Sequence, residues 1–537
     1  MDECMKERYE LAETRIREII TENTVKEPFG TFFRKMAEFL SMAAEVMDED
    51  DAEFSIKELK ERNYRFYKDI LPENYENSYG NPAYAVKKLG DCGKAFSFLY
   101  AELMGVTAYS HEKRLWDMTV SMELFLELYS AFCEEELPEA STVEGILRSY
   151  VNDYCQDMME QRIREGVDPK LDFAADIIMN SDLSDLRYLY KYGEYVSENE
   201  IDKMASTYTE GYRIGFITGR KDITKKKTVN IRYSLGFERM VKAAIIQFRK
   251  MGLDPVIYRH AVHAVNKRGS VRVGYTGGVA NPQYDYDHRQ DSALFLDGDF
   301  VQRKLRAMQT SYEKYKDLAN VHGGPACIDT FGEAPFSPVS KHEAYTLNET
   351  QQKLQTELDN ESGQIVNRYI KGDERSFTII AYPVPEIGGN YEEIFREIVK
   401  INTLDYHLYQ EIQQTIINTL DTCEWVEVKG RGDNETDLLI HLHELTDPKK
   451  QTNFENCVAD VNIPVGEVFT SPQLAGTGGI LHVKKVYLNG LQFRDLKLVF
   501  DCGQVIDYTC SNFKTEEENR KYIEDNILHH HPKIPMG

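Results

Sequence analysis

The sequence lacks any apolar run that approaches the roughly twenty residues of a membrane-spanning helix. It also lacks a signal peptide, because the start, Met1 to Glu7, is acidic and amphipathic. Nine cysteines are present without a single Cys-x-x-Cys pair, so neither a disulfide framework nor a zinc ribbon is expected. These absences favour a cytoplasmic protein with reduced thiols.

The sequence contains fewer basic than acidic residues. The chain has 64 basic and 89 acidic residues, which gives a net charge of -25. Repulsion would oppose approach to nucleic acid or to an anionic membrane, so we expect neither as a partner. A small neutral or cationic substrate is easier to accommodate.

No Gly-x-Ser-x-Gly elbow is present, which lowers the expectation of a serine hydrolase, and no internal repeat is evident. What is present is length, since 537 residues suffice for about three domains. From residue 1 to about 205, apolar residues recur at three- and four-residue spacing, which predicts an all-helical domain. We interpret its cluster Leu186, Tyr188, Leu189 and Tyr190 as core.

The periodicity changes near residue 228 and predicts an open α/β domain over residues 206–425. Its loop-rich segment, residues 320–375, is expected to cover a cleft. From residue 426 to 537 β signals dominate, so the predicted fold class is α/β multidomain with a β-rich third part. The expected strands are 228–233, 255–258, 292–296, 377–381, 426–428, 438–442, 481–488 and 496–500, and the expected helices are 238–251, 299–318, 350–370 and 391–420.

One acidic side chain stands on a constrained turn in Asn462-Ile463-Pro464-Val465-Gly466-Glu467-Val468-Phe469-Thr470-Ser471-Pro472. Pro464 restricts the preceding residue to extended geometry, and Gly466 permits an unusual backbone angle beside Glu467. Val468 and Phe469 then favour a strand. Glu467 is either a solvated carboxylate in a hairpin or a metal ligand.

This stretch resembles the first metal-ligand motif of the aminopeptidase T family, the thermophilic-type metalloaminopeptidases. The flanking sequence agrees in order, and the resemblance is clear over residues 426–537 and fainter over about 225–425. The supporting segments are Lys429-Gly430-Arg431-Gly432, Thr436-Asp437-Leu438, Gly478-Gly479, Phe493-Arg494-Asp495-Leu496 and Phe500-Asp501-Cys502-Gly503-Gln504-Val505.

The resemblance implies a homodimeric, metal-dependent aminopeptidase that removes N-terminal residues from peptides with a free N-terminus. It implies two divalent metal ions per site, with zinc, cobalt, manganese and magnesium all compatible, and it makes residues 426–537 the β-rich start of a metallopeptidase catalytic domain. Only Glu467 carries over as a metal ligand. The resemblance assigns no catalytic residue to this sequence.

The sequence departs from the family where a second Glu would follow. The stretch Pro532-Lys533-Ile534-Pro535-Met536-Gly537 resembles the approach to that Glu, and the printed sequence stops at the glycine. We therefore expect a C-terminally incomplete peptidase that lacks most ligands and is inactive as given. Two alternatives stay open, namely a non-catalytic peptide- or partner-binding protein on the same fold, and a hydrolase or transferase that uses residues 320–375.

Other polar clusters favour ordinary structural interpretations. His260-x-x-His263 would share a helix face but has no acidic partner in spacing, and His441 with His443 follows the pleat of a strand. Asp285, Asp287 and Asp291 around His288 are expected to form a solvated turn, and Gly476 to Gly479 a mobile turn. His529, His530 and His531 are adjacent and point in different directions, so adventitious metal binding is the most we expect of them.

Overall fold

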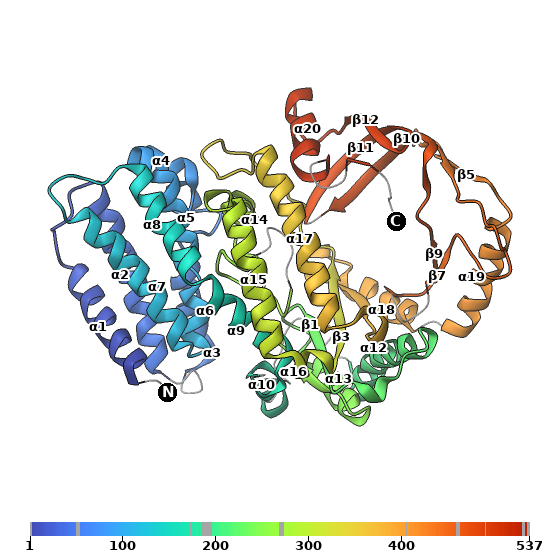
Figure 1. Cartoon of the computed structure of the whole chain (residues 1–537), viewed down its shortest axis with the longest axis horizontal. Helices are drawn as coiled ribbons and strands as arrows, with labels where there is room; N and C mark the ends of the chain where they lie inside the picture. Colours follow the sequence, from blue (N-terminus) through green and yellow to red (C-terminus); the bar gives the residue numbers. More distant parts are fainter. Residues whose placement is uncertain are drawn as a thin grey trace.

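The computed structural model describes residues 3–49, 54–171, 173–181, 183, 196–267, 273–403, 405–457, 462–488, 490–528 and 532–533. The cluster Leu186 to Tyr190, the histidines 529–531 and residues 534–537 lie outside this described part. The order of the parts confirms the expected fold class, with a helical region first, an α/β region next and a β-rich region last (Figure 1).

The first region is a bundle of helices, blue to cyan in Figure 1. Its apolar residues fall at helical spacing on buried faces, as Phe32, Phe33 and Met36 do in one helix. Ser55 begins another helix with a capping box to Glu58. The helices are α1 (Glu3–Ile19), α2 (Phe29–Asp48), α3 (Ile56–Tyr67), α4 (Pro82–Leu89), α5 (Gly93–Leu103), α6 (Val106–His111), α7 (Leu115–Phe132), α8 (Ala140–Asp153) and α9 (Cys155–Val167).

The hydrophobic core of this bundle includes helices from much later in the chain. The core residues Phe300 and Leu305 come from α15 (Gly298–Lys314), and Leu358 and Ile365 come from α17 (Glu349–Tyr369). Two shorter helices, α14 (Pro282–Asp287) and α16 (Lys316–Asn320), accompany them. Helices α15 and α17 therefore join the bundle to the rest of the molecule, in whose middle they stand in Figure 1.

A five-stranded parallel sheet, in the order β2-β1-β3-β4-β8, forms the second region. Helix α12 covers it through Tyr208 and Tyr212, whose hydroxyls donate to the carbonyls of Ala326 and Gly324 on β3. The elements are α10 (Phe173–Asn180), α12 (Glu198–Thr218), β1 (Thr228–Tyr233), α13 (Glu238–Lys250), β2 (Asp254–Val256), β3 (His322–Phe331), β4 (Thr378–Pro383), α18 (Tyr391–Asn402) and β8 (Asn462–Ile463).

One predicted strand in this region is wrong, and another strand was missed. The stretch 292–296, predicted as a strand, overlaps a single helical turn at Asp291–Leu294 that packs on the helical core. The segment 320–375 contains the expected helix as α17, but it begins with β3, the central strand of the sheet, which was not predicted. Gly323, Gly324 and Pro325 disfavour a strand in the sequence pattern, so the strand was not predicted. In the structure the two glycines let the backbone pass close to the Tyr212 hydroxyl and to the carbonyl of Ser376.

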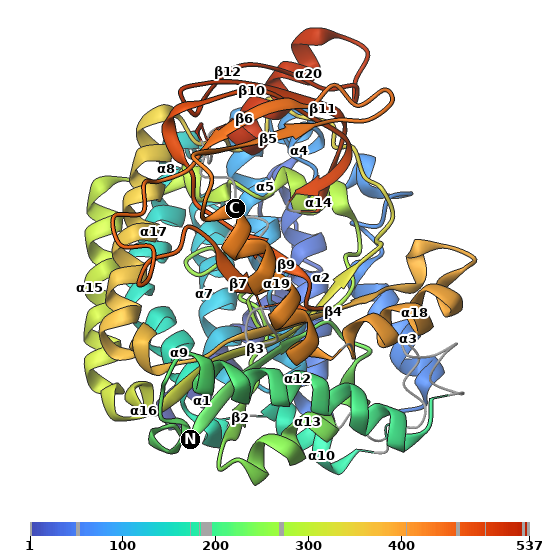
Figure 2. The same ribbon diagram turned by 90° about the vertical axis from the view of Figure 1, so that its right-hand side faces the viewer.

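The third region contains an antiparallel sheet in the order β12-β11-β10-β6-β5 and a separate two-stranded sheet of β7 and β9 (Figure 2). Phe493, Leu498 and Ile523 belong to the core between the larger sheet and α20. The elements are α19 (Tyr406–Leu420), β5 (Trp425–Lys429), β6 (Asp437–His441), β7 (Glu455–Cys457), β9 (Glu467–Phe469), β10 (Gln473–Leu488), β11 (Leu491–Asp501), β12 (Gln504–Thr509) and α20 (Glu516–Ile523).

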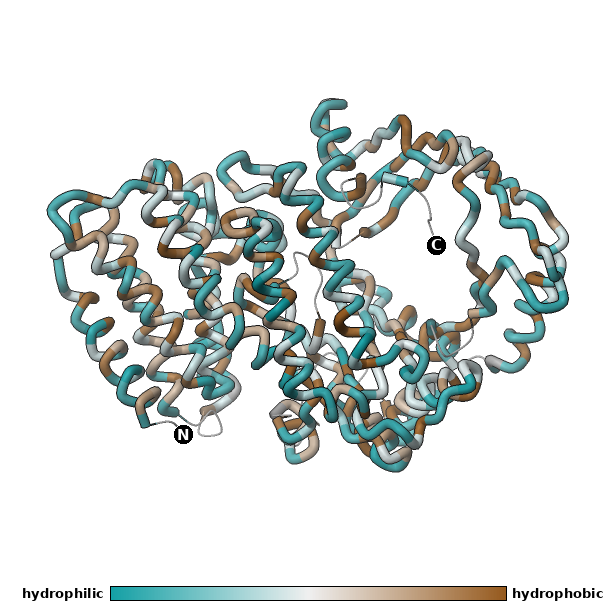
Figure 3. Tube along the Cα trace, in the orientation of Figure 1, coloured by the Kyte–Doolittle hydropathy of each residue, from teal (hydrophilic) through white to brown (hydrophobic). Residues whose placement is uncertain are grey.

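Polar and apolar residues alternate along the helices, so teal and brown alternate along the tube in Figure 3. Within the described residues, no helix combines the length and the apolar character needed to span a membrane.

Candidate functional site around Glu467

The motif that carries Glu467 connects the parallel sheet to the two-stranded antiparallel sheet. Ile463 ends β8, pairs with Ile380 of β4 and is buried in the core of the parallel sheet. The chain then turns at Gly466 and enters β9 at Glu467. Gly466 has a φ of 125°, which glycine adopts readily and other residues adopt only with strain. The predicted turn and strand are therefore both present.

The backbone of Glu467 is held firmly. Its strand pairs with β7, where Cys457 lies opposite Glu467. Gln413 on α19 is buried, and its side-chain amide donates to the carbonyls of Glu467 and Cys457, each at 2.8 Å. One helix residue thus ties the two strands to α19.

The carboxylate of Glu467 is free of such restraint. The residue is exposed, and Oε2 accepts one hydrogen bond, from Nδ2 of Asn462 at 3.2 Å. Asn462 is also the first residue of the motif, so this contact explains why an amide there suits a carboxylate five residues later. A side chain held by its backbone and open to solvent is accessible to a cation.

A dinuclear metal centre needs several carboxylates and imidazoles around the two ions. Across the described residues, no group of three or more His, Cys, Asp or Glu side chains is placed to hold a metal ion. Glu467 is the one motif ligand, and a single exposed carboxylate does not fit the requirements of such a centre. The described residues therefore do not form the two-metal site that the resemblance implies.

An open groove of about 500 Å³ lies beside the two-stranded sheet. Phe469 and Thr470, which follow Glu467 in the motif, line one side, and residues 451–455 line another. Thr470 Oγ1 donates to the carbonyl of Asn453 at 2.6 Å and fixes this wall. His443 also lines the groove, whereas His441 ends β6 and packs against Gly476. The two histidines do not form a site with Glu467.

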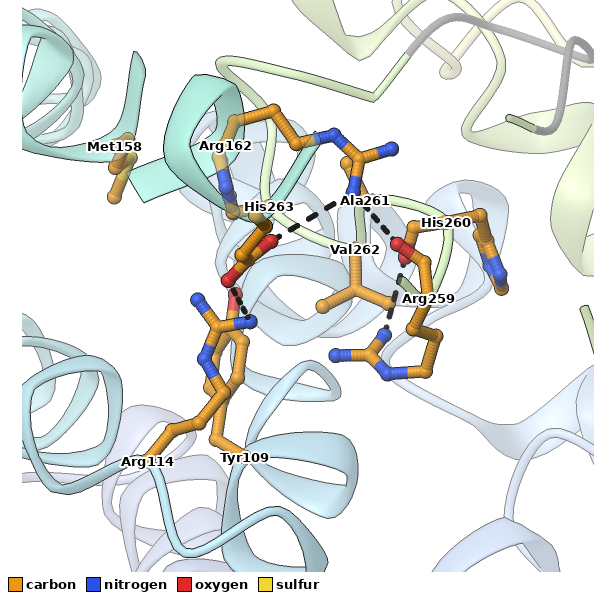
Figure 4. A pocket seen from close by; sticks show the side chains of 10 residues that line it. Tyr109, Arg114, Met158, Arg162, Arg259, His260, Ala261, Val262 and His263 are labelled. Atoms are coloured by element: carbon orange, nitrogen blue, oxygen red, sulfur yellow. Dashed lines mark hydrogen bonds and ion pairs between the residues drawn. The ribbon is translucent and has the colours of Figure 1, made fainter. Parts of the chain in front are cut away.

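The pair His260 and His263 does not lie on a helix but in an extended loop after β2. His263 lines a small polar cavity together with Arg114, Arg162 and Arg259 (Figure 4). Burial holds the pKa of His263 well below its usual value, and these three guanidinium groups lower it further. Such cationic surroundings disfavour a metal ion.

The cluster around His288 is not the solvated turn that its composition predicts. Asp287 is buried, where it pairs with Lys341 at 2.6 Å and accepts from the Tyr75 hydroxyl at 2.6 Å. His288 is also buried, with Nδ1 at 2.8 Å from Asp291 and Nε2 at 2.7 Å from the carbonyl of Gly80. The expectation was wrong because these partners lie far away in the sequence.

The glycine stretch Gly476 to Gly479 is not a turn either, because it lies inside the long strand β10. The register between β10 and β6 shifts between Gln473 and Gly478, and Gly476 and Gly479 both have positive φ. The extra residues therefore form a bulge that bends the strand. Cys502 and Cys510 are both free thiols, the first exposed and the second buried.

The family comparison agrees with the motif. The model of the thermophilic metalloprotease (M29) family matches residues 336–523, which include Glu467. No curated protein matches the chain. Among solved structures, wild-type AmpT from Thermus thermophilus matches with 15% identity and a TM-score of 0.36, and the match covers 61% of this chain and 75% of that chain. The match of residues 336–523 to this family model confirms the resemblance of that segment to the aminopeptidase T family.

Proposed function

We propose that the protein is an aminopeptidase, acting on peptides with a free N-terminus, and that Glu467 is one of its metal ligands. The observation that carries this proposal is the family match across residues 336–523, within which the Glu467 motif stands complete from Asn462 to Pro472. The geometry supports it, because Gln413 fixes the backbone of Glu467 while its carboxylate faces solvent.

We further propose that this chain alone has little or no peptidase activity. A lone carboxylate binds a divalent cation weakly, since it supplies one of the four or more donors that zinc, cobalt, manganese or magnesium requires. The described residues offer Glu467 no second carboxylate or imidazole in a ligand group. Activation of water by two metal ions would need further ligands.

The test combines metal titration with a peptidase assay. Calorimetric titration with Zn²⁺, Co²⁺, Mn²⁺ and Mg²⁺ should show weak binding that Glu467→Gln abolishes. Glu455→Gln is the matched control, because Glu455 is an exposed glutamate on the partner strand of the same two-stranded sheet. Equal metal binding by the two variants would remove Glu467 as a ligand.

The assay compares a peptide with a free N-terminus and its N-acetylated form, with added metal and with chelator. We expect cleavage of either peptide to be at the limit of detection. Metal-dependent cleavage of the free peptide alone, lost in Glu467→Gln, would support the aminopeptidase and contradict the proposed inactivity. Cleavage of the acetylated peptide would contradict the aminopeptidase.

The groove beside β9 favours a second candidate, a non-catalytic peptide-binding protein on the same fold. Its walls combine the aromatic rings of Phe454 and Phe469 with polar groups of Thr452 and Asn453, a mixture suited to an extended peptide. This candidate predicts that a fluorescent peptide binds equally well with and without chelator. Binding that requires added metal would contradict it.

A further inference from the structure

The small polar cavity that His263 lines is situated where the helical bundle meets the α/β region (Figure 4). Its volume is about 10 Å³, which is room for one group the size of a water molecule. Residues of α6 and α9 line it from the bundle, and the loop after β2 lines it from the α/β region. The charged residues of the lining are three arginines and one carboxylate, namely Arg114, Arg162, Arg259 and Glu165.

His263 has an unused hydrogen-bond donor. The side chain is buried, and Nδ1 has no hydrogen-bond partner among the described residues. The other ring nitrogen, Nε2, lies 3.4 Å from Nδ2 of Asn266, and this amide nitrogen also donates to the carbonyl of Met158 at 3.0 Å. Since an amide nitrogen only donates, Nε2 accepts, and the proton of the neutral ring is on Nδ1. A buried N–H without an acceptor is costly, so a partner for it is expected in the cavity.

Two of the three arginines have carboxylate partners. Arg259 lies 2.6 Å from Glu112, and Arg114 lies 2.8 Å from Asp117. A further carboxylate, that of Glu165, is 2.9 Å from Arg114. Burial acts to lower the pKa of both guanidinium groups, but the carboxylates overcome it and both pKa values are raised. The charge of each is therefore balanced inside the protein.

The charge of Arg162 is not balanced in this way. Its guanidinium donates to two backbone carbonyls, at 2.6 Å and 2.8 Å, and lies over the ring of Tyr258. Its one ion pair among the described residues is 3.9 Å long, with Glu165, which is closer to Arg114. The side chain is only 18% exposed, and burial lowers its pKa. A desolvated cation without a carboxylate at hydrogen-bond distance favours an anion beside it.

We propose that this cavity is an anion site that binds one chloride ion, held by the guanidinium of Arg162 and the Nδ1–H of His263. Size selects chloride, because it is close to a water molecule in volume, whereas phosphate and sulfate are several times larger. The sign of the field selects an anion over water. The charges that lower the pKa of His263 are all cations, namely Arg114, Arg162, Lys304 and Arg259.

The bound ion joins two regions of the chain. Arg162 belongs to α9 of the bundle, whereas His263 follows β2 of the parallel sheet. Unfolding separates these two groups, so chloride binds the folded chain in preference and stabilises it by mass action. The role of the site is therefore structural, and the ion holds the loop after β2 against α9.

Salt exchange tests the site in the full chain. Thermal unfolding is followed while sodium chloride replaces sodium gluconate at constant ionic strength, because gluconate is too large for the cavity. Chloride should raise the midpoint by about 2 °C or more, and the rise should saturate as the site fills. Equal midpoints in the two salts would overturn the proposal and make water the occupant.

Substitutions test the two donors. Arg162→Gln removes the unbalanced charge and should abolish the effect of chloride. Arg164→Gln is the matched control, because Arg164 is on the same helix and does not line the cavity, and it should leave the effect intact. His263→Phe keeps a ring without the Nδ1–H and should weaken chloride binding about tenfold. A chloride effect that survives Arg162→Gln would overturn the proposal.

Two measurements on the unaltered protein locate the ion, so the test does not depend on whether the variants fold. Hydrogen exchange of peptides from residues 257–265 should be slower in chloride than in gluconate, while peptides from β11 exchange equally in both. Crystals grown in bromide should give an anomalous-scattering peak in contact with Arg162 and His263. A cavity without this peak would overturn the proposal. The outcome is independent of the proposed peptidase function, because Glu467 does not line this cavity.

Discussion

The helical region and the region around Glu467 differ in how deeply they are packed. The core of the bundle holds interlocked rings, with Phe96 in edge-on contact with Phe32 and Phe33. The two-stranded sheet rests instead on a small cluster of Ile417, Leu442 and Phe454. The candidate site therefore stands beside the smallest hydrophobic cluster of the described residues, whereas the largest clusters lie in the bundle and the parallel sheet. This difference predicts that substitutions affect stability and function in different regions.

The largest effect is expected in the bundle. Phe96→Ala removes a fully buried ring from the aromatic cluster and should lower the free energy of unfolding by about 4 kcal/mol, because the neighbouring rings cannot close the cavity. Hydrogen exchange in increasing urea, followed on peptides from α2, α5 and α7, measures this. Tyr64→Ala, at an exposed helical position, is the control and should change the value by less than about 0.5 kcal/mol. Similar losses in both variants would contradict deep packing of the bundle.

A buried carboxyl in the bundle should make stability depend on pH. Burial raises the pKa of Glu102 to about 7 from its usual 4.5, against hydrogen bonds from the Ala264 amide and the Tyr150 hydroxyl. Between these values the folded protein keeps a proton that the unfolded chain releases, so stability falls as pH rises. The total loss is about 3 kcal/mol, complete above pH 7.

Glu102→Gln should therefore flatten the dependence of stability on pH between about 4.5 and 7, measured by urea denaturation at several pH values. Glu73→Gln makes the same chemical change at an exposed position and should leave the dependence intact. Tyr150→Phe removes one hydrogen bond to the carboxylate and raises the folded-state pKa of Glu102 further, so the loss should become larger and extend to higher pH. A profile that Glu102→Gln does not alter would contradict this assignment.

A smaller effect is expected near the candidate site. Phe454→Ala removes a ring from the small cluster, but the ring also borders the open groove. Because neighbouring groups can relax toward the groove, the loss should be about 2 kcal/mol, below the usual cost for a buried phenylalanine. Hydrogen exchange of peptides from β7 and β9 measures it, with Ile506→Ala at an exposed position as the control. A loss as large as that of Phe96→Ala would remove the contrast between the two regions.

The sequence predicted the elements that have a clear periodicity. Strand β1, helix α13 and helix α17 lie where the sequence pattern places them, because local residue preferences decide them. Strand β3 was missed, since Gly323, Gly324 and Pro325 are poor strand formers and tertiary contacts override their preference. A pleated sheet around β3 is visible only after its neighbours β1 and β4 are in place.

The candidate site was also predictable only where local residue preferences determine it. The turn at Gly466 and the strand that begins at Glu467 follow from local residue preferences, and the structure contains both. The role of Gln413 was not predictable, because its amide reaches strands more than forty residues later. The buried pair of Asp287 and Lys341 was hidden for the same reason, since pairs distant in the sequence leave no local pattern.

The smallest effect on stability is expected at the residue with the largest proposed role. Glu467 is exposed, and its carboxylate accepts one hydrogen bond from Asn462 that glutamine can also accept, so Glu467→Gln should change the free energy of unfolding by less than about 0.5 kcal/mol. Urea denaturation without metal measures this. Gln413→Leu is the matched contrast, because it leaves the carbonyls of Cys457 and Glu467 without their shared donor and should cost about 2 kcal/mol. A carboxylate that contributes nothing to stability and yet binds metal is retained for chemistry, whereas a large loss in Glu467→Gln would make it a structural residue.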